Sequence, residues 1–215
     1  MPSNHLLSNI GSGFMVAIQY QDSVTAYELL QVVLDMAAFT VLIYNNPEGF
    51  QESEGQVADQ RNFIHHRLMS LPQSPDSQFQ FLQNGTYEAL RLASIIYSLL
   101  VVFPISFLTA PFGPLALQLR VQISKLEIEN SKSDAELQLI YWIVFLGGVA
   151  SIGSAERPWY VSTLSVISQR LNLTVWKDVK GLLECFLWLG TVSDMDGILL
   201  WEEIQQLHLR GSGPH

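Results

Sequence analysis

Apolar residues recur every three or four positions along most of the chain, which is typical of helices that bury one face. The pattern predicts helices over residues 27–44, 61–71, 87–103, 115–129, 137–148, 160–171 and 176–187, and a last helix that ends at Gly211. No stretch shows the alternation typical of strands. The sequence therefore predicts an all-α protein, in which about seven or eight helices form a single globular domain over residues 1–215.

Local signals mark where several of these helices begin and end. Thr25 and Ser133 are each followed three residues later by Glu, the capping-box pattern of a helix start. Pro104 should end the helix over 87–103, because a proline disfavours helical geometry in the residue before it. The polar, acidic segment 45–60 and the segment 72–84, which holds two prolines, are expected to be loops.

Two long runs carry no charge, residues 92–119 and 137–155. A helix needs about 20 apolar residues to cross a bilayer. Three prolines interrupt the first run, and the second contains Gln138 and several small residues. We expect helices that are apolar on all sides to lie buried at the centre of the domain rather than in a membrane.

The charge balance narrows the classes of function. The net charge is −9, and the 11 Lys and Arg residues are scattered, so direct nucleic-acid binding by this chain is not expected. Charged residues make up only 14%, which favours a surface partly covered by partners. The single cysteine, Cys185, excludes an intrachain disulfide and lies among apolar neighbours, which is typical of an inert core thiol.

The stretch WLGTVSDMDGILLWEE, residues 188–203, resembles a damaged calcium loop. If Gly197 takes the sharp turn, Asp194 and Asp196 fall on ligand positions and Glu203 on the closing one. Val192, however, occupies the first position, where an EF-hand loop carries aspartate. We therefore expect Asp194 or Asp196 to cap the last helix, with Gly197 easing the turn.

Other candidate chemistry is weaker. His65 and His66 are adjacent, so on a helix they point about 100° apart and do not chelate one ion. We expect no metal, no cofactor and no catalytic set, and hence no enzyme activity. In the segment ERPWY, Arg157 precedes Trp159 and could clamp the carboxylate of a small ligand. One arginine specifies little, so an internal pair with Asp or Glu is favoured.

Four segments in order, 61–72, 87–104, 141–189 and 196–204, resemble the C-terminal effector, or middle-homology, domain of fungal-specific transcription factors. The resemblance is strongest over residues 60–205. Its pattern places an arginine before an aromatic residue, then a W-x-x-V/L-K-x-x-L helix, F-x-W and G-x-x-L-W-E-E. Here these are Arg157 with Trp159, residues 176–183, Phe186 with Trp188, and residues 197–203.

This resemblance implies a ligand-responsive regulator of transcription that acts in the nucleus, or else in the cytoplasm. It implies protein partners or self-association, and allows a small apolar ligand. Candidate ligand-binding residues are Arg157, Trp159, Trp176, Trp188 and Trp201. Such regulators usually carry a zinc cluster built from six cysteines, which this chain lacks. The alternatives are a small-molecule-binding or cyclase-like biosynthetic protein of the same fold and, last, a membrane-associated helical protein.

Overall fold

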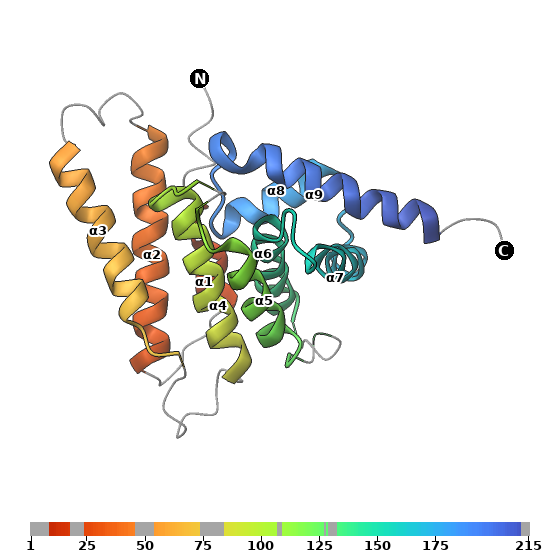
Figure 1. The fold of residues 1–215 in the computed structure, drawn as a ribbon, viewed down its shortest axis with the longest axis horizontal. Helices are drawn as coiled ribbons and strands as arrows, with labels where there is room; N and C mark the ends of the chain where they lie inside the picture. The colour runs from red at the N-terminus through yellow and green to blue at the C-terminus, as the bar shows by residue number, and fades with distance from the viewer. Residues whose placement is uncertain are drawn as a thin grey trace.

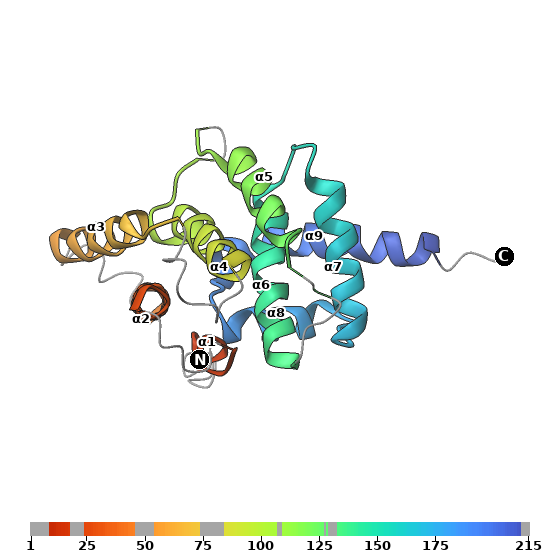
Figure 2. The same ribbon diagram turned by 90° about the horizontal axis from the view of Figure 1, so that it is seen from below.

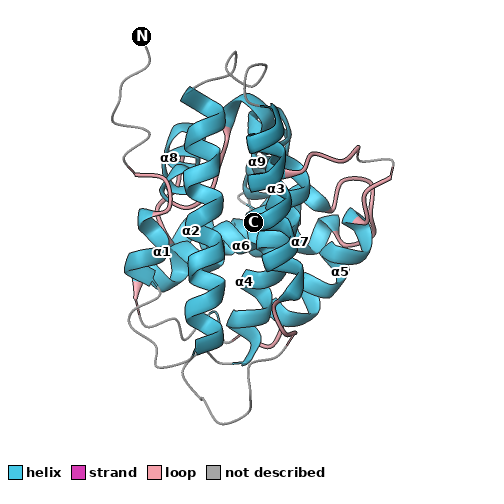
Figure 3. Cartoon of the chain, turned by 90° about the vertical axis from the view of Figure 1, so that its left-hand side faces the viewer, coloured by secondary structure: helices cyan, strands magenta, loops and turns pink. Residues whose placement is uncertain are grey.

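The computed structural model describes residues 9–17, 24–45, 54–73, 84–106, 109–126, 128 and 133–211. These residues form nine α-helices and one π-helical turn, and no strand occurs among them (Figures 1 and 3). The helices are α1 Ser12–Ala17, α2 Val24–Asn45, α3 Glu54–Ser70, α4 Asn84–Tyr97, α5 Phe112–Ile123, α6 Asp134–Ala150, α7 Arg157–Arg170, α8 Trp176–Cys185 and α9 Gly190–Gly211. The prediction of an all-α fold is confirmed.

Helix α6 forms the centre of the domain. Every residue from 139 to 150 is buried, so the expectation of a helix buried on all sides is confirmed. Helices α1, α4, α5, α7, α8 and α9 pack around it (Figure 2). Its start follows the predicted capping box, because the Ser133 side chain accepts a hydrogen bond of 3.2 Å from the Glu136 backbone N–H.

Helices α2 and α3 lie side by side at one edge of the molecule and join the centre through α4 (Figure 1). Arg67 of α3 forms an ion pair with Asp35 of α2. The hydroxyls of Thr40 in α2 and Tyr97 in α4 share a buried hydrogen bond of 2.8 Å. Helix α4 widens into the π-helical turn Ser98–Val102 and ends before Pro104, as the sequence predicts.

Two predicted helix starts are wrong, and one helix was not predicted. The expected loop over 45–60 contains the first two turns of α3, because buried Val57 continues the apolar face of Ile64 and Leu68. Helix α9 starts at Gly190, well before Asp196. The short helix α1 was not predicted. In the predicted loop 72–84, residues 74–83 lie outside the described residues, and α4 begins at Asn84.

Among the described residues, no helix combines the length and the apolar content that a membrane crossing requires. The uncharged run 137–155 instead supplies the central helix. The described part of run 92–119 is divided between α4, the π-helical turn and α5. The low charge content of the chain is thus partly explained by the apolar sequence that the core demands.

Candidate functional site

Arg157 connects three helices where α6, α7 and α9 meet. Its guanidinium donates to the Glu203 carboxylate of α9, with Nη2–Oε1 at 2.8 Å and Nε–Oε2 at 3.1 Å. Its Nη1 also donates to the carbonyl of Gly148, near the end of α6, at 2.5 Å. The guanidinium therefore binds groups of the chain itself. The sequence favoured such an internal pair over binding of a ligand carboxylate.

The glycine pair at the end of α6 lets the neighbouring helices approach closely. A Cβ at Gly147 would overlap the ring of Tyr160, and a Cβ at Gly148 would lie 2.6 Å from Leu200 Cδ2. The Tyr160 hydroxyl crosses α6 at this point and donates to the carbonyl of Ala116 in α5 at 2.7 Å. The lack of side chains at these two positions of α6 thus allows α5, α7 and α9 to pack closely against the centre of the domain.

A cavity of about 370 Å³ opens to solvent beside Arg157. It is lined by Ile152, Gly153, Arg157, Leu199, Glu202, Glu203 and Gln206. Ile152 and Leu199 give it an apolar wall, and they remain 45% and 48% exposed. Glu203 is matched by Arg157, whereas Glu202 has no hydrogen-bonding or ion-pair partner among the residues that the structure describes.

A second cluster joins α8 and α9 to the core through two indole rings. Trp188 is 2% exposed and meets Phe145 of α6 edge-on, with ring centroids 5.5 Å apart. Trp176 lies 6.3 Å from Trp188, also edge-on. Gly197 makes room for both rings, because a Cβ there would lie 2.6 Å from Trp176 Cη2 and 2.7 Å from Trp188 Cζ2.

Asp194 completes this cluster. The indole N–H of Trp188 donates to its Oδ1 at 2.8 Å, and Lys180 Nζ donates to its Oδ2 at 2.5 Å. The predicted capping role of Asp194 or Asp196 is wrong, because both lie inside α9 rather than before it. Gly197 is helical too, so it does not ease a turn. A continuous helix over the stretch also leaves no loop to wrap a calcium ion.

The five candidate ligand-binding residues lie in different surroundings. Arg157 lines the cavity, and the four tryptophans are not among its lining residues. Trp159 is half-buried and meets Tyr160 edge-on at 5.0 Å between centroids. Trp201 is only 6% exposed and belongs to the core, as Trp188 does. Trp188 and Trp201 therefore act as packing anchors, and a ligand-binding role for the five residues stays a prediction.

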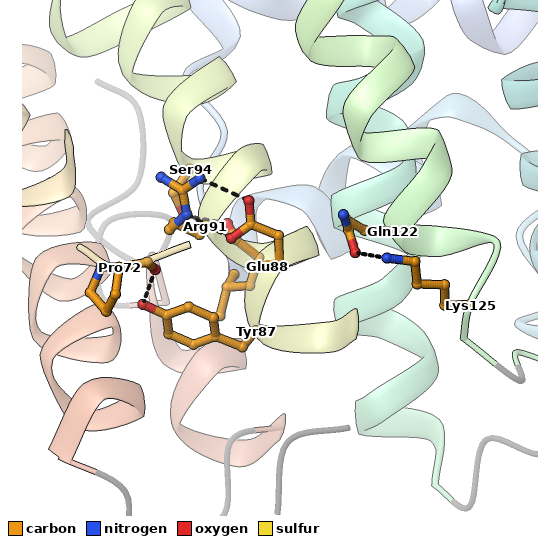
Figure 4. A network of polar contacts seen from close by, with 8 residues as sticks. Pro72, Tyr87, Glu88, Arg91, Ser94, Gln122 and Lys125 are labelled. Carbon is orange, nitrogen blue, oxygen red and sulfur yellow. Dashed lines mark hydrogen bonds and ion pairs between the residues drawn. The ribbon is translucent and has the colours of Figure 1, made fainter. Parts of the chain in front are cut away.

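Two polar side chains of α4 also have partners within the fold. Arg91 in α4 is 6% exposed and forms two hydrogen bonds of 2.8 Å with Glu88 (Figure 4). The Tyr87 hydroxyl beside them donates to the carbonyl of Pro72 at 3.1 Å (Figure 4). Burial is the main cause that raises the pKa of Tyr87 to about 12, so its phenol stays protonated.

The histidines and the cysteine occupy separate environments. His65 Nδ1 and Ser98 Oγ share a hydrogen bond of 3.0 Å, and the ring stacks on Phe103, whereas His66 is exposed. Burial lowers the pKa of His65. Cys185 is half-buried, and burial, then the negative charge of Glu184, raises the pKa of its thiol. In the described part of the chain, no three His, Cys, Asp or Glu side chains cluster as metal ligands do.

Comparisons with protein-family models, with curated proteins and with solved structures found no match. The geometry itself offers two features for function. One is the Arg157–Glu203 junction with its open cavity, and the other is the outer surface of α9 beside it. The sequence indicated Arg157, but it placed Glu203 in a calcium loop and gave no role to Lys180 or Leu199, because the partners and exposure of these side chains depend on the folded arrangement.

Proposed function

We propose that this chain is a regulatory interaction domain that controls transcription in the manner of the fungal effector domains it resembles. It acts through protein partners, and another module binds the DNA. The observation that carries the proposal is the arrangement of the motif residues. One contact joins Arg157 to Glu203. A second brings together Trp176, Trp188 and Gly197, and the two contacts join helices α6 to α9.

Three further properties support an interaction role. The net charge of −9 opposes contact with a phosphate backbone. The polar side chains Arg157, Arg91 and Asp194 are engaged by other groups of the chain, which is the use expected of a scaffold. Exposed apolar side chains gather on α9, where a partner could cover them.

A reporter assay tests the proposal. The full chain is fused to an unrelated DNA-binding module with a site upstream of a reporter gene in yeast, and the module alone gives the baseline. We expect the fusion to raise or lower reporter expression. Gly181→Ala should keep the effect, because a Cβ there meets nothing within 4 Å. Gly147→Val should abolish it, because the added side chain collides with Tyr160.

Reporter expression equal to the baseline, at matched fusion levels, would count against a role in transcription. Nanomolar binding of DNA by the unfused chain at physiological salt would contradict the proposal that another module binds DNA. Native mass spectrometry of the purified chain examines the alternative. A stoichiometric small molecule that co-purifies, and is lost on substitution of residues lining the cavity, would favour the ligand-binding protein instead.

A further inference from the structure

Helix α9 carries an apolar stripe on the side that faces away from the core. Its inner face is formed by residues such as Ser193, Gly197, Leu200 and Ile204, which are buried. The outward stripe consists of Val192, Met195, Leu199, Glu202, Gln206 and Leu209. These positions follow alternating steps of three and four residues, the spacing of a helix seam that packs against another helix.

The outward stripe differs from the solvent face expected of a surface helix. Such a face is normally charged or polar, yet four of its six positions are apolar. Val192 is 50% exposed, Met195 72%, Leu199 48% and Leu209 76%. Single exposed apolar residues are ordinary, but a row with helical spacing indicates an interaction surface. The helix has 22 residues and is therefore about 33 Å long, enough for a seam of several turns.

The position of α9 leaves this side open. Its C-terminal turns project beyond α7 in two perpendicular views (Figures 1 and 2). The cavity beside Arg157 adjoins the middle of the stripe, since Leu199, Glu202 and Gln206 belong to both. Ile152 extends the apolar wall, and Glu202 adds a carboxylate to the lining. A long side chain with an apolar stem and a cationic head fits this combination.

The charged residues beside the stripe indicate the charge expected of a binding partner. Glu203 and Asp194 are matched by Arg157 and Lys180. Asp196 and Glu202 have no ion-pair partner among the described residues, so the stripe carries unmatched negative charge. A second copy of this chain would bring the same carboxylates and its own net charge of −9 against them. Charge complementarity instead selects a basic partner.

We propose that the outward stripe of α9 binds an amphipathic helix of another protein, with an apolar seam flanked by Lys or Arg. One basic side chain of that helix enters the cavity between Ile152 and Glu202, and the seam covers Met195 and Leu199. This inference rests on the proposed interaction function and names the surface and the chemistry of the partner. It adds a role for Met195 and Leu199, which the motif of the resemblance does not specify.

Two synthetic helical peptides test the chemistry directly. Both carry leucine in steps of three and four, and the flanking positions are lysine in one and glutamate in the other. Fluorescence anisotropy measures their binding to the full chain at physiological salt. We expect the lysine peptide to bind and the glutamate peptide to bind far more weakly. Absence of lysine-peptide binding at about 100 μM would overturn the proposal.

Matched variants separate seam binding from general charge attraction. Leu199→Asp should weaken binding of the lysine peptide about tenfold or more, although it adds a negative charge to the protein. Leu117→Asp on α5 is the control, because Leu117 is 49% exposed and Leu199 48%. It should leave the affinity unchanged. Glu202→Lys should weaken the lysine peptide and strengthen the glutamate peptide. Equal effects of Leu199→Asp and Leu117→Asp would refute seam binding.

Two further outcomes distinguish this inference from the proposed function. In the reporter assay, Leu199→Asp should remove the effect of the fusion and Leu117→Asp should keep it. If both variants keep it, the stripe is not the regulatory surface, and the proposed function stands without it. Sedimentation that reveals a dimer abolished by Leu199→Asp would assign the stripe to a second copy and overturn the choice of partner.

Discussion

Replacing Gly197 with alanine isolates the close approach of two indoles to α9. In the interior of a helix, Gly→Ala is worth about 1 kcal/mol of stability when the new methyl group is unhindered. At Gly197 the Cβ would lie 2.6 Å from Trp176 Cη2 and 2.7 Å from Trp188 Cζ2. Carbon atoms pack at about 3.5–4.0 Å, so the rings must move by about 1 Å. Such overpacking typically costs about 1–3 kcal/mol.

Gly181 provides the matched control. It also lies inside a helix, α8, and a Cβ there meets nothing within 4 Å. Both substitutions gain the same helix propensity, so the difference between their unfolding free energies reports the overpacking cost, about 1–3 kcal/mol. Urea denaturation followed by tryptophan fluorescence and circular dichroism measures both values. Equal stabilisation by the two alanines would refute the close packing of Gly197 against the indoles.

Five other substitutions test the remaining features. Arg157→Ala should destabilise the fold by about 2–3 kcal/mol because it removes charged hydrogen bonds, and Glu203→Gln by less; equal losses in urea denaturation would contradict this. Trp201→Ala should cost about 3–5 kcal/mol by the same assay, and a loss below about 1 kcal/mol would place the indole outside the core. Burial lowers the pKa of His65, so the unfolded chain binds its proton more readily than the folded one. Stability should therefore fall as pH drops below the ordinary value of 6.5. His65→Gln should flatten this dependence in pH-resolved melts, and His66→Gln, at an exposed neighbour, should leave it intact.

The sequence was sufficient to predict the fold class and most of the helices. Apolar positions in a helix repeat with a local period, and a window of a dozen residues therefore reveals them. The capping box at Ser133 and the stop before Pro104 were read correctly for the same reason. The start of α3 was missed because residues 54–60 are mostly polar, and Val57 alone carries the apolar face there.

The candidate site depends on long-range contacts that no local pattern contains. Arg157 and Glu203 are separated by 46 residues, so the sequence indicated an acidic partner without identifying it. A glycine directly after two spaced aspartates is typical of a turn, but two indoles from outside α9 require the missing side chain of Gly197. The capping role predicted for Asp194 is wrong for the same reason. Its carboxylate accepts hydrogen bonds from Trp188 and Lys180, which lie outside α9.

Helix α9 separates the positions that fix the fold from the positions available for recognition. In its G-x-x-L-W-E-E segment, the anchors Gly197, Leu200 and Trp201 are buried, whereas the intervening Ile198 and Leu199 are 36% and 48% exposed. The residues that carry the family resemblance therefore orient the helix, and exposed Leu199 between them belongs to the proposed partner surface. A protein with the same anchors and different intervening residues should keep this fold and choose another partner, because inward packing and outward chemistry lie on opposite sides of one rigid element.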